Sequence, residues 1–412
     1  MDTPQYQQHK RDIEQRETIV LCTVFSECGD YLVAANNFGY INIWYLNTPL
    51  LHGGSVSSSN SSNHINGNNK QQQQQQMMMI DHQYDDYTCS YSFKAHNTPV
   101  NCLLFYDDSQ LLSSDDTEIR AWDWQLIKDI IKSKREDPTA SGVNRTIKHL
   151  YDIPSPQKVG TRGALSERSE INGMDRDSNG KLYIGCGNSN AYCWDIRSGR
   201  NVASFVGHKD YVHQVKWNRS YNTLITSSED ATVRIWDTNT AQCQTILTPH
   251  LKKSMAPDST STTNGHVNGT STPASSEQQS NHWTGALDFD VTGNWLVVGG
   301  STLTMWYLGK LNTMSAMLSN RPCESFHSVI FEKDRVMACG SERIVNYYGL
   351  DGNLLMKVPS TNDILYTLAY NPLQRNQILV AGGTSPLINT YINQENIAFS
   401  YYFNNNDSSS SS

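Results

Sequence analysis

The residues most suggestive of chemistry lie within one regular stretch, residues 207–237, which reads "GHKDYVHQVKW" and later "EDATVRIWD". His208 and Asp230 are of the types that serve as a general acid and base, and Trp236 would add an aromatic platform for a substrate. Catalysis would require these groups to surround a cavity that a substrate can enter. The alternative is that they bond only to one another, inside the fold.

We predict the second arrangement, a buried hydrogen-bonded relay. Asp230, in a tight turn, would accept from His208, and His208 would contact the hydroxyl of Thr226 or Ser227. That hydroxyl would reach the indole N–H of Trp236, so that every buried polar group has a partner. A repeated set is expected of a scaffold and not of a single active site. The set recurs at His96, Asp116 and Trp122.

Other patterns in the chain do not match the motifs of metal-binding, phosphate-binding or nucleophilic sites. The acidic turns "SDDTE" and "SSED" lack the spaced oxygen ligands of a calcium loop. The "GCGNSN" segment (185–190) resembles a phosphate-binding loop, but no helix follows it. The nine cysteines contain no C-x-x-C pair, and no G-x-S-x-G occurs. We therefore predict no catalytic residues, no cofactor and no metal site.

The tetrapeptide "WDIR" offers a different function. Trp194, Asp195 and Arg197 resemble the Trp-Asp-x-Arg box by which some WD-repeat proteins dock on the adaptor of cullin ubiquitin ligases. The same four residues also occur as ordinary ends of repeats. The alternative function is thus a substrate receptor of a cullin-type ligase.

The elements that would position these residues are short antiparallel strands. Residues 207–237 show period-2 alternation in "VHQVKW", "TLITSS" and "TVRIWD", separated by turn residues in "NRSYN" and "EDA". Three such strands ending in Trp-Asp, with an outer strand that ends in Gly-His, make one blade of a WD-repeat propeller.

The blade pattern repeats along the chain. Trp194 to Trp236 is 42 residues, Trp306 to Tyr348 is 42 and Tyr348 to Tyr391 is 43, within the 40–45 expected of a blade. Two earlier blades would close at Trp44 and Trp122. We predict an all-β, seven-bladed WD-repeat β-propeller over residues 18–403, with a flexible segment over 1–17 and a disordered tail over 404–412.

Three long spacings between blade ends, of 78, 72 and 70 residues, indicate insertions. Those over about 52–83 and 252–281 are rich in Ser, Asn, Gln and Thr, so we predict disorder there. The third, over about 124–168, contains "QLIKDIIKSKRED" with helical apolar spacing, and we predict a partly helical insertion. We expect the C-terminal strand Glu395–Phe403 to complete the last blade, with the stretch Ile13–Ile19 as its rival.

The charge and the apolar runs of the chain bear on where the protein acts and what it binds. The net charge is −8 and the pI is near 5.8, which argues against a protein whose main role is binding nucleic acid phosphates. The first 17 residues have no apolar core of a signal peptide, and no apolar run approaches the roughly 20 residues needed to cross a bilayer. We expect an intracellular protein without a membrane contact.

Several blades resemble one family, THO complex subunit 6, the WD-repeat component of an assembly that couples transcription to mRNA export. The resemblance rests on "FSECGDYLVAANNFGYINIWYL" (25–46), "LLSSDDTEIRAWDW" (111–124), "WTGALDFDVTGNWLVVGGSTLTMWYL" (283–308) and "SFHSVIFEKDRVMACGSERIVNYYGLDGNLLMKVPS" (325–360). The "NNFGYI" turn and the two last blades, which lack Trp-Asp, are its most specific parts. It covers nearly every blade and leaves out the low-complexity insertions.

The resemblance implies a nuclear scaffold subunit without enzymatic activity or cofactor. Such a subunit would contact the helical and coiled-coil subunits of the THO complex and, through them, the mRNA export machinery. It would support messenger ribonucleoprotein assembly and mRNA processing, with RNA contacted indirectly. No single residue is carried over from the family as a partner contact.

Overall fold

Residues 207–237 form the first three strands of one sheet in the computed structural model of the chain. They are β13 (Val212–Asn218), β14 (Thr223–Ser228) and β15 (Val233–Asp237), and β16 (Cys243–Leu247) completes the sheet on its outer side. Every residue of β14 is buried, because both faces of this sheet are covered by neighbouring sheets. A strand covered on both faces needs apolar or hydrogen-bonded residues throughout, and "TLITSS" supplies both.

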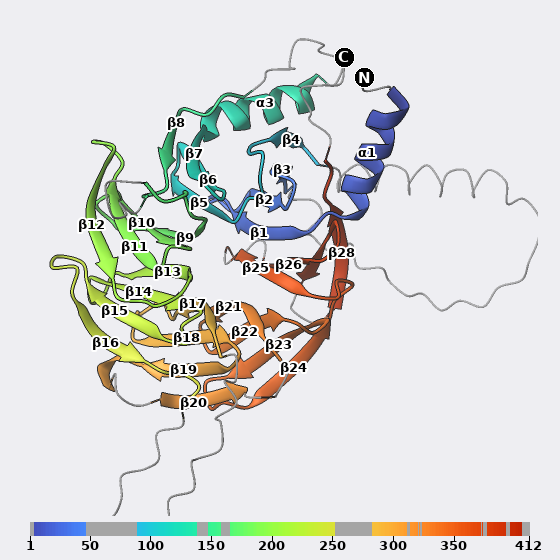
Figure 1. The fold of residues 1–412 in the computed structure, drawn as a ribbon. Coiled ribbons are helices and arrows are strands. Elements are labelled where there is room, and N and C mark those ends of the chain that lie inside the picture. Colours follow the sequence, from blue (N-terminus) through green and yellow to red (C-terminus); the bar gives the residue numbers. More distant parts are fainter. Residues whose placement is uncertain are drawn as a thin grey trace, which may run out of the picture.

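Seven four-stranded antiparallel sheets of this kind form a closed ring, so the predicted seven-bladed propeller is confirmed (Figure 1). Each blade uses four strands that are consecutive in the sequence. The other six blades, in chain order, are β1 (Val20–Phe25), β2 (Tyr31–Asn36), β3 (Tyr40–Tyr45) and β4 (Tyr91–Lys94); β5 (Cys102–Asp107), β6 (Gln110–Ser114), β7 (Glu118–Asp123) and β8 (Tyr151–Pro154); β9 (Ile171–Arg176), β10 (Lys181–Cys186), β11 (Asn190–Asp195) and β12 (Arg200–Val206); β17 (Thr284–Phe289), β18 (Trp295–Gly300), β19 (Leu303–Tyr307) and β20 (Met314–Ser319); β21 (Phe326–Glu332), β22 (Arg335–Gly340), β23 (Ile344–Gly349) and β24 (Leu354–Pro359); β25 (Leu365–Asn371), β26 (Ile378–Gly383), β27 (Leu387–Ile392) and β28 (Asn396–Tyr402).

The structure describes most of the chain but not all of it. The described residues are 4–46, 89–137, 147–157, 165–251, 282–310, 314–319, 321, 324–371, 373, 377–392 and 396–405. The two segments predicted to be disordered, 52–83 and 252–281, lie outside them. In the sequence the first falls between β3 and β4 of one blade, and the second falls between β16 and β17, which belong to different blades.

The last blade is completed by the C-terminal strand, as expected. β28 pairs antiparallel with β27 in register Leu387↔Tyr402. The fold extends past the expected boundary at residue 403, because Asn405 is only 4% exposed. Its side chain bonds to Asn36 (2.7 Å) and Thr18 (2.7 Å), which ties the end of the chain to its beginning.

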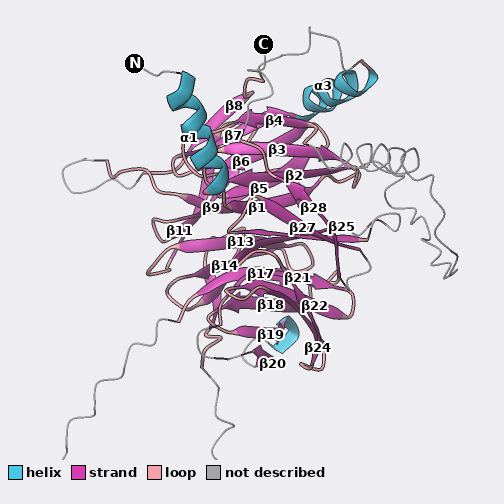
Figure 2. Cartoon of the chain, turned by 90° about the vertical axis from the view of Figure 1, so that its right-hand side faces the viewer, coloured by secondary structure: helices cyan, strands magenta, loops and turns pink. Residues whose placement is uncertain are grey.

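Helices flank the first two blades and the chain termini. Residues Pro4–Arg16, within the segment expected to be flexible, form α1, and the side chain of Gln15 donates to the carbonyl of Phe403 (2.6 Å). The "QLIKDIIKSKRED" segment falls in α3 (Trp124–Glu136), which buries an apolar face that includes Ile127. Figure 2 shows both helices outside the stack of sheets. A short 3-10 helix, η4 (Leu308–Lys310), follows β19. No helix among the described residues is long and apolar enough to span a membrane.

The backbone of the "NNFGYI" turn requires the glycine at position 39. Gly39 has φ of 79°, and a Cβ there would lie 2.1 Å from the carbonyl oxygen of His96. Only glycine tolerates that conformation and that approach. The carbonyl of Gly39 accepts from the N–H groups of Ala95 (2.8 Å) and His96 (3.1 Å), so the turn holds the chain that enters the second blade.

The core lies between the blades. One apolar cluster joins the last blade to the first and includes Val20, Trp44, Val380 and Ile388, all at most 1% exposed. Burial of these side chains favours ring closure at about 25 cal/mol per Å² of apolar surface removed from water. Each sheet has its first strand at one edge, and the ring places these seven short edges around the axis, where they are protected from other chains.

Candidate functional site

The predicted relay exists in the blade formed by β13–β16. His208 Nδ1 lies 2.9 Å from Asp230 Oδ2, and His208 Nε2 lies 2.7 Å from Thr226 Oγ1. Trp236 Nε1 donates to the same Thr226 oxygen at 2.9 Å. Because the carboxylate can only accept, Nδ1 of the imidazole is the protonated nitrogen and Nε2 accepts the threonine hydroxyl proton.

Burial gives this relay a structural role. The side chains of His208 and Asp230 are 0% and 5% exposed, so no substrate reaches them. Burial alone would raise the pKa of Asp230, but the hydrogen bonds from His208 and Thr232 hold that pKa well below its ordinary value. An ionised, fully paired carboxylate stabilises a turn and is a poor proton acceptor.

The second relay involves a different aspartate from the predicted one. His96 Nε2 lies 2.7 Å from Ser113 Oγ, and Trp122 Nε1 donates to that oxygen at 2.9 Å. The carboxylate beside His96 belongs to Asp115, with Oδ2 at 3.1 Å from Nδ1. The predicted Asp116 instead accepts from Asn101 (3.2 Å).

The turns that carry the two relay aspartates differ in length but share one backbone bond. Ser114 pairs with Ile119, whereas the corresponding Ser227 pairs with Val233, so this turn is one residue shorter. The relay aspartate accepts the N–H two residues later in both blades, at Thr117 (2.8 Å) and Thr232 (3.0 Å). Counting back from the paired third strand, as from Trp236 to Asp230, would lead to Asp116, so it is the bond from the N–H two residues later that identifies Asp115.

Two of the blades without the relay bond buried polar groups in other ways. Trp306 Nε1 donates to Thr304 Oγ1 on its own strand at 3.0 Å. In the last blade Asn389 Oδ1 accepts from Ser360 Oγ (2.7 Å) and from the N–H of Thr361 (3.0 Å). Asparagine here fills the place of the histidine relay as a link between turn and strand.

The "WDIR" residues form an ordinary blade turn. Asp195 Oδ1 accepts from the N–H of Arg197 at 3.0 Å. Asp237 Oδ1 accepts in the same way from the N–H of Asn239 at 2.7 Å, in a blade without the box. Trp194 has no hydrogen-bond partner for its indole N–H within the described part of the chain. The bond at Asp195 therefore has a counterpart at a blade end that carries no such box.

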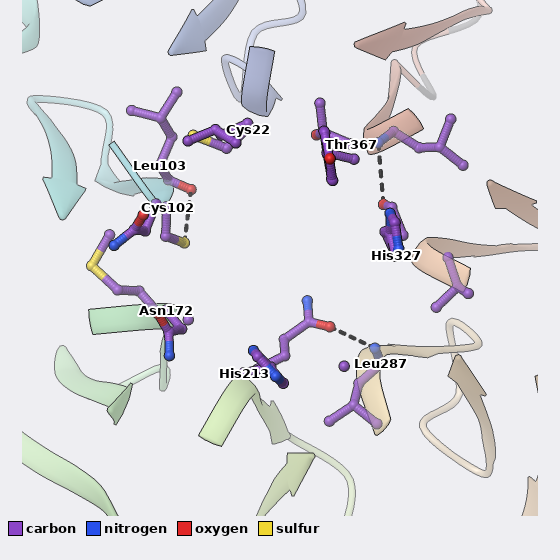
Figure 3. Close-up of a pocket in the computed structure, with 18 of the residues that line it drawn as sticks. Cys22, Cys102, Leu103, Asn172, His213, Leu287, His327 and Thr367 are labelled. Atoms are coloured by element: carbon purple, nitrogen blue, oxygen red, sulfur yellow. Dashed lines mark hydrogen bonds between the residues drawn. The ribbon is translucent and has the colours of Figure 1, made fainter. Parts of the chain in front are cut away.

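The candidate site is the channel along the ring axis, lined by the first strands of all seven blades (Figure 3). Its volume is about 590 Å³. Side chains of several first strands cross to the next blade. Gln214 Oε1 accepts from the N–H of Leu287 (2.5 Å), and Thr367 Oγ1 accepts from the N–H of Thr23 (3.0 Å). A third bond of the same kind joins the N–H of Leu368 to Ser328 Oγ (3.1 Å).

We call these cross-blade bonds latches. In two blades the residue at the usual latch position cannot accept a hydrogen bond, and an aspartate takes its role. Gly173 and Ala286 occupy the strand position that Gln214 fills in its own blade, and neither has a side chain that can accept. In those two blades an aspartate two residues further along makes the latch. The pairs are Asp175 Oδ2 with the N–H of Trp217 (2.6 Å) and Asp288 Oδ2 with the N–H of Phe331 (2.8 Å).

Lys216, a cation in the channel wall, interacts with the two aspartates that form latches. Lys216 Nζ lies 3.5 Å from Asp288 Oδ1. Burial would lower the pKa of Lys216, but the charges of Asp288 and Asp175 raise it above its ordinary value. The pKa of Asp175 is raised, chiefly by burial, although Lys216 opposes the rise. Within the described residues, no group of three His, Cys, Asp or Glu side chains is placed to bind a metal ion.

Aromatic rings gather at one end of the channel, at the start of the first strands. Trp283 lies with its ring centroid 5.8 Å from the imidazole of His213 on one side and 5.8 Å from that of His327 on the other. Tyr366 stacks on His327 at 5.2 Å. Burial lowers the pKa of His327, which keeps this ring neutral and able to stack.

Sequence reasoning missed the latches and these rings. His213 and Gln214 were read only as part of an alternating strand, and Trp283 only as part of a blade. The available signal was a polar or aromatic residue at the axis-facing positions of a first strand. That signal becomes visible only once the strand nearest the axis is known.

The comparisons with known proteins agree with this fold. Residues 87–123 and 199–237 match the family model "WD domain, G-beta repeat". THO complex subunit 6 of Arabidopsis thaliana is 29% identical over 286 residues, 68% of each chain. The human THO complex subunit 6 is 25% identical over 391 residues, 92% of this chain and 93% of its own. The zebrafish (Danio rerio) homolog is 25% identical over 398 residues, 95% of this chain and 99% of its own. The resemblance to THO complex subunit 6 is thereby confirmed.

Proposed function

We propose that the chain is a non-catalytic WD-repeat scaffold subunit of a nuclear THO complex, supporting assembly, processing and export of messenger ribonucleoprotein through protein contacts. The observation that carries the proposal is the reach of the similarity. Proteins named THO complex subunit 6 or its homolog match 92% and 95% of this chain, far more than the WD repeats at 87–123 and 199–237. A likeness confined to the regular WD blades would carry much less weight.

The distribution of polar side chains supports a scaffold without catalysis. The acid–base pair of His208 and Asp230 is buried in its relay. Asp175, Asp288 and Gln214, which face the channel, accept backbone N–H groups of the next blade. Groups held in this way stabilise the ring and are not free to react.

The partners in this proposal are the helical and coiled-coil subunits of the complex, and through them the export machinery. RNA is contacted indirectly. The net charge of −8 opposes phosphate binding, and Lys216, the one lysine among the described residues that line the channel, is paired with Asp288. Docking through the Trp194–Arg197 box is not part of the proposal, because that turn matches the one at Asp237.

The test is affinity purification of the tagged full-length chain from nuclear extract, with and without ribonuclease. We expect THO-type subunits to be recovered in both conditions. The matched control is Arg197→Ala, which removes the cation of the box and should leave recovery unchanged. If THO-type subunits are absent, or are lost on ribonuclease treatment, the assignment to the complex is wrong.

A further inference from the structure

A side cavity opens beside the aromatic end of the channel and has no part in the framework described above. Its volume is about 380 Å³, and it is lined by Asp210, His213, Glu229, His282 and Trp283. It shares His213 and Trp283 with the channel. We call it the acidic aromatic pocket. We propose that it binds the guanidinium group of an arginine in a basic segment of a protein partner.

The charges of the pocket point to a cation. Two carboxylates, Asp210 and Glu229, line it together with rings, and none of its described lining residues is Lys or Arg. Glu229 lies 3.0 Å from His213 Nε2, and its side chain remains 45% exposed. The carboxylate is therefore held in place by one imidazole and still open to a ligand. The chain's net charge of −8 adds an attraction for basic segments at long range.

The rings point to a planar cation. Trp283 is only partly buried and presents the best side chain for a cation–π contact. It stands between the rings of His213 and His327, which fix its position. A guanidinium stacks flat on an aromatic face and pairs bidentately with a carboxylate, whereas an ammonium group does neither as well. An arginine matches both features of the pocket at once.

A nucleobase could stack on the same rings, but its phosphates would then face two carboxylates with no cation in the lining. The basic peptide is the better fit. This inference rests on the proposed protein-binding role and adds the chemistry of one partner. Peptide binding by the purified chain and recovery of THO-type subunits are separate measurements, so that failure of one leaves the other standing.

The experiment is fluorescence anisotropy with the purified full-length chain and a labelled peptide of repeated Arg-Gly-Ser. Two matched peptides replace arginine by lysine or by its neutral analogue citrulline, and a labelled oligo-uridylate of similar length serves as the RNA probe. We expect the arginine peptide to bind, the lysine peptide to bind about threefold more weakly or worse, and the citrulline peptide about tenfold more weakly.

The variants locate the binding. Glu229→Gln, at an exposed side chain, and Trp283→Leu should each weaken arginine-peptide binding about fivefold. Thermal unfolding checks that both variants are folded. The matched control is Asp334→Asn, which removes a carboxylate that is 76% exposed in the β21–β22 turn, at the opposite end of the first strands. Its binding should stay within twofold of the parent chain.

The following results would each overturn the proposal. They are equal binding of the citrulline peptide, equal binding of the lysine peptide, the same loss for Asp334→Asn as for Glu229→Gln, and Trp283-dependent binding of the oligo-uridylate in place of the peptide. Binding that Glu229→Gln leaves unchanged would place the arginine elsewhere on the surface and would equally sink the assignment.

Discussion

Replacing Thr226 by valine tests the relay most directly. Valine has nearly the shape of threonine, so the change leaves no cavity while it removes the hydroxyl. Two buried groups then lose their partner, the indole N–H of Trp236 and Nε2 of His208, at 2.9 and 2.7 Å from the lost oxygen. Thr226 is 0% exposed, so water cannot take its place. Each stranded group costs about 1–3 kcal/mol, which gives a total of about 2–6 kcal/mol.

A matched comparison is available one blade further along the chain. Thr304 is also 0% exposed, and its hydroxyl accepts from Trp306 Nε1 at 3.0 Å. Among the hydrogen bonds of the described residues, no imidazole shares this hydroxyl. Thr304→Val therefore strands one buried donor, at a cost of about 1–3 kcal/mol. The relay predicts that Thr226→Val destabilises the protein by more than Thr304→Val does.

The assay is urea-induced unfolding of both variants and the parent chain, followed by tryptophan fluorescence and by circular dichroism. His208→Phe is added alone and together with Thr226→Val. Because the two positions share one hydrogen bond, the double variant should lose less stability than the sum of the single losses. Equal costs for Thr226→Val and Thr304→Val, or strict additivity in the double variant, would refute the relay.

Three further outcomes follow from the same contacts. Asp115→Asn should lower the free energy of unfolding by about 1–3 kcal/mol and Asp116→Asn by much less, which urea titration measures; the reverse order would restore the sequence-based choice of Asp116. Thr367→Val leaves the N–H of Thr23 without its acceptor at the junction of the last and first blades, and hydrogen exchange should show that amide exchanging faster than in the parent. The lowered pKa of Asp230 stabilises the fold fully above the unfolded value of about 4, and this contribution is lost as the pH falls toward the lower folded-state pKa. Asp230→Asn should therefore flatten the decline of stability measured between about pH 5 and pH 2, and an unchanged slope would contradict the ionised relay.

The sequence predicted the fold well because its signals are local and repeated. Period-2 alternation marks each strand, the turns carry Asn, Asp and Gly, and the aromatic residue that ends each third strand recurs at blade spacing. Ring closure followed from geometry, since an open ring would leave the apolar faces of the first and last blades exposed. The helix at Trp124–Glu136 shows the same principle, because its apolar residues recur at helical spacing.

The sequence failed where the backbone path of one short turn decided the outcome. Asp115 and Asp116 are neighbours of the same type, and no composition rule separates them. The choice depends on the path of the turn, in which Asp115 accepts the N–H groups of Thr117 and Glu118 and so faces His96. The boundary at residue 403 failed for a related reason, since Asn405 is held by Asn36 and Thr18 from the start of the chain.

The sequence by itself determined the repeat, the class of fold and the members of the relay at His208, Asp230 and Trp236, because each depends on residues within one blade. Only the tertiary structure decided which side chains reach between blades. The latches, such as Thr367 with the N–H of Thr23, and the acidic aromatic pocket around Trp283 join residues from different blades. Their meeting depends on the angle and stagger of packed sheets, which no single blade specifies.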